Sequence, residues 1–276
     1  EHIPALLYWQ VSASKRRNKT NYRIAMELSI SKKNVPMHFT FENTKHKLGL
    51  RIWGNRISFH ELHELLNECW DCTEIDMSRA EACSYIGVIS YFSYSVRHAF
   101  MGDRLVKVDG KPLKDWNDEL FQLFEKGQEL FEVGIEISWP QMLFIMASWW
   151  ECLKHHDCPS SALPIMREFT DNIEHLLQQR NKTQYPAIEP YIHGAIYAAN
   201  PYLMHTMEHI NVDYLQWARI GKVSMDKLAE MMQCSAFGSW KYEDYMSTLK
   251  KHAKKLGCLV EELQQQVDDS VYDIEL

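Results

Sequence analysis

The chain has 276 residues, of which 46% are hydrophobic and 24% are charged, and these values exclude disordered, collagen-like and coiled-coil proteins. Thirty Lys and Arg residues against 37 Asp and Glu give a net charge of −7, which argues against general binding to nucleic acids or membrane surfaces but leaves room for a local basic patch. Seven cysteines cannot all pair within the chain and no apolar run is long enough to cross a bilayer, so we expect a cytoplasmic protein.

The first 36 residues differ from the rest in charge. They hold seven basic residues against two acidic ones, a net charge of +5, and they end just before Met37, which opens a segment that looks like a natural beginning. We therefore interpret residues 1–36 as a basic N-terminal extension. Residues 37–158 are expected to form an α+β core domain, and residues 159–276 a helical region packed on it, with an acidic tail from about residue 261.

The core domain is expected to begin with a hairpin followed by two helices. His38–Glu42 and Leu48–Trp53 are β-rich runs joined by a polar turn. Ser58 and Glu61 have the spacing of a capping box, and so have Ser78 and Glu81. The first of these helices carries an apolar stripe, and the second, which runs to about Phe100, is apolar on nearly all sides and is expected to be buried. The stripe consists of Phe59, Leu62, Leu65, Leu66 and Cys69.

The remaining elements alternate between short strands and helices before the chain becomes helical. Ser138 and Gln141 have capping-box spacing, with Pro140 in the tolerated first turn. The expected elements are strand Arg104–Val108, turn Asp109-Gly110, helix Asp115–Lys126, strand Leu130–Ile137, helix Met142–Leu153 and, beyond Pro159, helices that include Met225–Cys234, Trp240–Leu256 and Leu259–Val267. This order predicts an α+β fold: a small, mainly antiparallel sheet in the N-terminal half, covered by helices, and an all-helical C-terminal half.

Two stretches of the chain resemble a family of uncharacterised bacterial proteins, a domain of unknown function. One is Glu42-Asn43-Thr44 in the predicted hairpin, and the other is the run Arg97-His-Ala…Gly-Asp-Arg104 after the predicted buried helix. The resemblance covers about residues 37–158, so residues 1–36 lie outside it. It implies a bacterial cytosolic protein and no particular activity.

Familiar catalytic motifs are missing from the sequence. There is no glycine-rich phosphate loop, no GxSxG and no HExxH, so catalytic residues are unknown and we expect no cofactor. Two groups have spacing that would suit zinc, with core thiols as the competing interpretation. These zinc candidates are Cys69, Cys72, Cys152, His155 and Cys158.

Four polar residues follow the apolar helix and form a candidate site for an anion or other ligand: Arg97, His98, Asp103 and Arg104. Charged side chains at the end of a buried helix need partners or a shared cleft. One interpretation is architectural, with Asp103 pairing with Arg97 or Arg104. The other is functional: two guanidinium groups bind a carboxylate or phosphate, with His98 as the titrating neighbour.

The sequence leaves three functions open. The first is a binding or scaffold protein with a protein partner, suggested by the abundant aromatic residues, some of which could be exposed together. The second is a DNA-binding protein, because residues 225–256 resemble a helix-turn-helix in which Ser235 starts the recognition helix. The third is a metal-binding protein or an enzyme of undefined chemistry. No membrane partner is expected.

Overall fold

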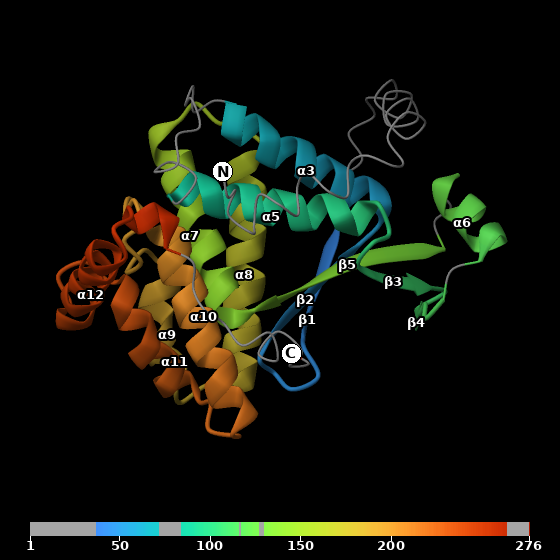
Figure 1. Ribbon diagram of the computed structural model, residues 1–276. Coiled ribbons are helices and arrows are strands. Elements are labelled where there is room, and N and C mark those ends of the chain that lie inside the picture. Colours follow the sequence, from blue (N-terminus) through green and yellow to red (C-terminus); the bar gives the residue numbers. More distant parts are fainter. Residues whose placement is uncertain (1–36, 72–83, 116, 127–129, 264–275) are drawn as a thin grey trace.

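The computed structural model describes residues 37–71, 84–115, 117–126, 130–263 and 276. It confirms the predicted α+β class, with an antiparallel sheet formed by the N-terminal half and a C-terminal half that is helical (Figure 1). Within these residues, no helix combines the length and the apolar character needed to cross a bilayer. The expected capping box at Ser78 and Glu81 lies outside the described residues.

The sheet has one buried face and one polar face. Leu50 pairs with Ile137, and both side chains are buried against the helices. Arg51 points to the opposite face, where its Nε donates to Glu136 Oε2 over 2.6 Å. This alternation is the pattern expected of antiparallel strands covered on one side. The strands lie in the order β1 (Phe39–Asn43), β2 (Gly49–Gly54), β5 (Phe131–Ser138), β3 (Leu105–Val108) and β4 (Lys111–Pro112).

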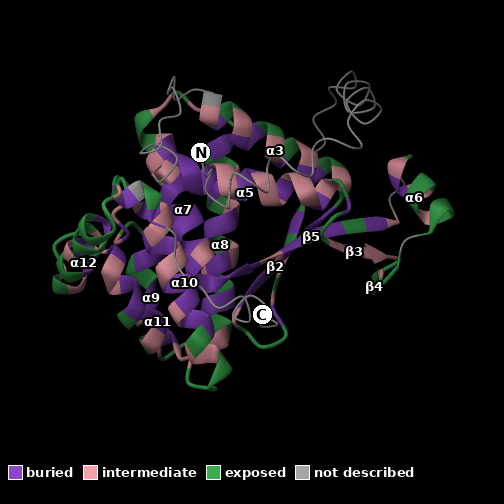
Figure 2. Ribbon diagram, viewed as in Figure 1, coloured by how far each residue is buried: buried purple, intermediate pink, exposed green. Residues whose placement is uncertain are grey.

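Three helices pack against the sheet. Helix α3 (Arg56–Asp71) packs on α5 (Tyr85–Phe100), and both contact β5. Helix α7 (Trp139–His155) is buried on most of its surface, and it contacts both α5 and the sheet (Figure 2). The smaller α6 (Asp118–Glu125) lies at the edge that carries β3 and β4 (Figure 1).

The C-terminal helices share one hydrophobic core with the sheet. This core continues from Phe39 on β1 to Met232 on α11, and the rings of Phe39 and Phe169 meet edge to face at 5.5 Å. Side chains from both sides of residue 158 contribute to this one core. The proposed division of the chain at residue 158 stays a prediction. The helices are α8 (Ala162–Arg180), α9 (Tyr185–Ile192), α10 (Leu203–Arg219), α11 (Met225–Met232) and α12 (Trp240–Leu256), with short 3₁₀ turns η1 (Gln233–Ser235) and η2 (Val260–Glu262).

One predicted helix start is wrong and another is confirmed. Helix α3 begins at Arg56, and the Asn55 side chain accepts a hydrogen bond from the Ser58 backbone N–H at 2.7 Å. The Ser58 hydroxyl instead accepts from the His38 backbone N–H at the start of the hairpin, so Ser58 does not form the predicted capping box with Glu61. At α7, Ser138 and its partner three residues later make both bonds of the predicted box.

Candidate functional site

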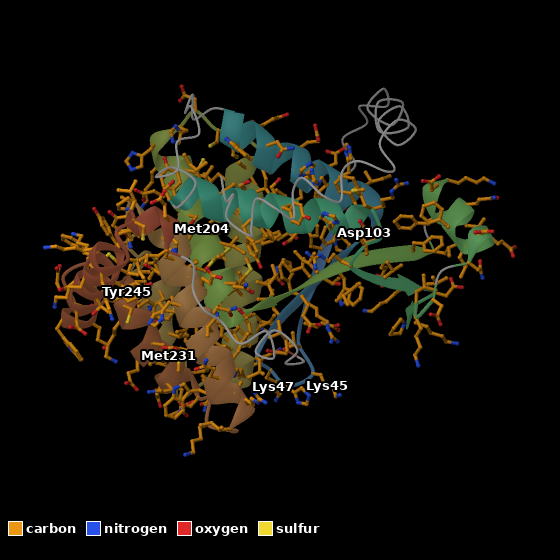
Figure 3. The ribbon with its side chains drawn as sticks, viewed as in Figure 1. Lys45, Lys47, Asp103, Met204, Met231 and Tyr245 are labelled. Carbon is orange, nitrogen blue, oxygen red and sulfur yellow. The ribbon has the colours of Figure 1, made fainter. Side chains whose placement is uncertain are left out.

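The four candidate residues at the end of α5 do not form one cluster. Gly102, with φ of 80°, reverses the chain after the helix, and the Asp103 backbone N–H donates to the His98 carbonyl. This turn brings Asp103 Oδ2 to 2.9 Å from His98 Nδ1. Asp103 therefore pairs with His98, whereas the sequence suggested an arginine partner. The helix end lies at the surface and not inside the domain, since the side chains of His98 and Asp103 are 18% and 49% exposed (Figure 3).

Arg97 and His98 both contact the ring of Tyr94. Its guanidinium lies 4.9 Å from the centre of the Tyr94 ring, and the His98 ring lies 4.3 Å from the same centre. Arg97 Nε and His98 Nε2 are buried, and neither has a hydrogen-bond partner among the described residues. Arg104 is exposed and is not part of this group. Burial raises the pKa of the Tyr91 hydroxyl, and the Arg104 charge partly offsets this rise. The structure thus places two of the four residues, Arg97 and His98, against one aromatic ring, and Asp103 joins them through His98.

A polar network between α3 and α5 adjoins Arg97. Ser93 donates its single hydroxyl hydrogen to Asn67 Oδ1 at 3.0 Å, so His63 Nδ1 must carry the hydrogen that joins it to Ser93 Oγ at 2.9 Å. Asn67 Nδ2 completes the ring of bonds by donating to His63 Nε2 at 3.1 Å. The neutral imidazole is therefore fully bonded, and the Ser93 hydroxyl is directed away from His63. This geometry holds two helices together and does not activate a nucleophile.

The electrostatic surroundings of His63 favour its neutral form. Burial, the Arg97 guanidinium and His60 lower the pKa of His63 from 6.5 to about 4. Protonation at Nε2 would also place two donors face to face, because Asn67 already donates there. His63 and Asn67 are one helical turn apart, and this spacing is the sequence signal that could have indicated their contact. The partner Ser93 could not be found from sequence, because it lies 30 residues from His63.

The zinc candidates are only partly brought together. Cys152 Sγ lies 3.7 Å from Cys158 Sγ and 3.4 Å from the Cys69 carbonyl oxygen. His155 instead pairs with Glu151 at 3.2 Å on an exposed part of α7, and Cys72 is outside the described residues. Across the described part of the chain, no group of three or more His, Cys, Asp or Glu side chains could hold a metal ion.

The segment that resembles a helix-turn-helix departs from that motif in its turn. Helix α11 ends at Met232, and α12 begins only at Trp240, where the Ser239 hydroxyl caps the helix by accepting from the Tyr242 N–H. Ser235, expected to start the second helix, is buried and donates to the Met232 carbonyl. Residues 233–239 thus separate the helices, a longer link than the three or four residues of the motif.

The same segment exposes two large aromatic side chains. Trp240 is 71% exposed and Phe237 is 68% exposed. Phe237 also contacts the rings of Tyr197 and Tyr242, with centroids 4.8 and 5.7 Å apart, so it extends an aromatic layer that begins inside the protein. The second half of α12 adds exposed lysines, namely Lys250, Lys251, Lys254 and Lys255. We call these two aromatic residues and four lysines the α12 surface.

The α12 surface and the end of α5 lie in different parts of the molecule. Figure 3 places Asp103 at the end of α5 near the sheet, whereas Tyr245 of α12 lies at the opposite side of the protein. The α12 surface and the end of α5 are therefore two separate candidate sites. Neither contains a recognisable catalytic arrangement among the residues that the structure describes.

Comparison with known proteins identifies the family but no function. Residues 39–275 match the model of a domain of unknown function, DUF6904, and the chain belongs to this family. The match includes the hairpin and the Arg97–Arg104 stretch, and it extends through the C-terminal helices. No curated protein and no solved structure matches the chain.

Proposed function

We propose that this member of the family is a protein-binding module of the bacterial cytosol, and that its α12 surface binds an acidic partner. The observation that carries the proposal is the exposure of Trp240 and Phe237. Large aromatic side chains are enriched at the centres of protein interfaces, where burial on binding recovers their hydrophobic free energy. The odd cysteine count and the sequence resemblance support the cytosolic location.

The charge of α12 supports an acidic partner. The helix carries Glu243 and Asp244 in its first half but no acidic residue from Met246 to Leu256. Lys254 and Lys255 in the last turn offset the negative end of the helix dipole, which is an architectural role. Lys250 and Lys251 lie a turn earlier, are exposed and form no ion pair with the described acidic residues. Positive charge without a counterion among the described residues favours a negatively charged partner.

Selection from a displayed library of random peptides tests this proposal on the purified protein. We expect the enriched peptides to combine acidic residues with aromatic or aliphatic ones. Trp240→Ala should weaken binding of a selected peptide at least about 10-fold. Ile57→Ala is the matched control, because Ile57 is an exposed apolar residue on α3, and it should leave the affinity unchanged. Failure to enrich any peptide, or equal affinity in both variants, would refute the proposal.

Binding to duplex DNA is the competing function of the α12 surface, and a separate titration with duplexes tests it. A DNA-binding α12 would bind mixed-sequence duplexes with an affinity that falls steeply with salt. That affinity would be lost on changing Lys250 and Lys251 to Glu but retained in Trp240→Ala. Such a result would show that the partner of the α12 surface is a nucleic acid and not a protein.

A second candidate function is binding of a small anion beside Arg97. It is favoured by the buried Nε of Arg97, which has no acceptor among the described residues, and by the nearby His63, whose pKa is lowered by burial and by the Arg97 charge. Inorganic phosphate should then raise the melting temperature of the wild type but not that of Arg97→Met. Arg104→Met is the control, because Arg104 lies outside this group and should retain the response. Equal responses in the wild type and both variants would exclude the site.

A further inference from the structure

The C-terminal end of α7 brings two thiols into contact. His156 ends the helix in an extended conformation, and the Cys158 backbone N–H then donates to the His156 carbonyl at 2.8 Å. This reversal returns Cys158 to the last turn of the helix. Its Sγ lies 3.7 Å from Cys152 Sγ and 3.8 Å from the Cys152 carbonyl oxygen. The contact therefore follows from the turn that ends the helix.

The two thiols differ in their access to solvent. Cys152 is fully buried, whereas Cys158 is half-buried and follows the helix end. Both are reduced in the structure. A disulfide requires the sulfurs to approach by about 1.7 Å from their present separation, since a disulfide bond is about 2 Å long. Rotation of the Cys158 side chain at the end of the helix can supply this approach.

We propose that Cys152 and Cys158 are a reversible thiol–disulfide pair that exchanges with a small disulfide such as oxidised glutathione. The Cys158 thiolate attacks one sulfur of glutathione disulfide, which forms a mixed disulfide and releases one glutathione thiolate. The Cys152 sulfur then attacks the Cys158 sulfur, its proton passes to the departing glutathione thiolate, and the second glutathione leaves as a thiol. Two protein thiols are oxidised and one glutathione disulfide is reduced to two thiols, so electrons and protons balance.

Oxidation of the pair would remove a hydrogen bond to the C-terminal end of α3. The Cys152 thiol donates to the carbonyl oxygen of Cys69, in the last turn of that helix, at 3.4 Å. A disulfide has no hydrogen to donate, so this bond is lost when the pair is oxidised. The redox state of α7 is thereby coupled to the contact between α7 and the C-terminal end of α3.

Mass spectrometry of the full chain in glutathione buffers tests the proposal. The reduced protein is equilibrated at a series of oxidised-to-reduced glutathione ratios, quenched with acid and alkylated. We expect the oxidised protein to carry two fewer alkyl groups than the reduced protein, and dithiothreitol added before alkylation should restore both. Trypsin cleaves after Lys154, between the two cysteines, so the disulfide should appear as two joined peptides.

Cysteine variants separate this pair from other thiols. Cys158→Ser removes the half-buried thiol and should abolish the internal disulfide, and Cys152→Ala should leave Cys158 as a stable glutathione adduct. Cys234→Ser and Cys258→Ser are the controls, because these two cysteines are not part of the pair, and both should leave the disulfide unchanged. A wild type that accumulates a glutathione adduct on Cys158, stays reduced, or joins Cys152 to a different cysteine overturns the proposal.

Discussion

Lowering the pH from 7 to 5 should destabilise the protein through His63. The bonds with Ser93 and Asn67 use the neutral imidazole, with Nδ1 as donor and Nε2 as acceptor. The unfolded chain has no such restraint, and its histidine takes up a proton near pH 6.5. Between the folded pKa of about 4 and 6.5, the unfolded state therefore binds more protons. Stability from this group is complete above pH 6.5 and is lost as the pH falls toward 4.

The size of the effect follows from the two pKa values. A shift from 6.5 to about 4 corresponds to about 2 kcal/mol of stability lost between pH 7 and pH 5. His63 is only half-buried, so solvent screening reduces this to about 1 kcal/mol. Other carboxyl and imidazole groups titrate in the same range. The contribution of His63 must therefore be read from a difference between variants.

Urea unfolding of the wild type and His63→Gln at both pH values isolates the effect. The wild type should be the more stable protein at pH 7, and its advantage should shrink by about 1 kcal/mol at pH 5. In NMR titrations, Arg97→Met should raise the pKa of His63, because the guanidinium is the second cause of its depression. Arg104→Met is the control and should leave it unchanged. An advantage that is equal at both pH values would refute this account of His63.

Three further substitutions test packing, capping and the exposed aromatic surface. Gly134→Ala should cost about 2 kcal/mol in urea unfolding, because the added Cβ would lie 2.6 Å from Trp53 Cε3; a neutral effect would mean that the indole can move away. Ser138→Ala should cost about 1–2 kcal/mol in the same assay, because it removes a helix cap and the donor to buried Asn211; a loss below about 0.5 kcal/mol would contradict this. Trp240→Ala should change the stability by less than about 0.5 kcal/mol, and a large loss in thermal unfolding would show that the indole has a structural role.

Local patterns predicted most of the fold, and the failures occurred where distant residues compete. The hairpin, the buried helix and the Ser138 cap depend on neighbours within a few positions, and the structure has all three. Ser58 has an equally good local pattern, but its hydroxyl binds the backbone of His38, 20 residues away. Asn55 then takes over the cap, and the helix starts three residues earlier than the apolar stripe suggested. A capping motif shows which residue can cap, while tertiary contacts decide whether it does.

The candidate sites show the same division between local and distant information. The pairing of His98 with Asp103 spans five positions and needs only the turn at Gly102. The sequence interpretation chose an arginine partner because arginine always carries the opposite charge to Asp103. The network around His63 joins two helices, so its third member could not be read from one of them.

The exposure of Trp240 could have been derived from the sequence. Tyr242, Tyr245, Met246 and Ala253 form the buried stripe of α12. Trp240 lies two positions before the stripe, and at about 100° per residue it points about 160° away from Tyr242. An apolar residue opposite the stripe of an amphipathic helix is directed to solvent whatever the rest of the fold does. Its position on the helix, and not the number of aromatic residues in the chain, is the sequence signal for a partner surface.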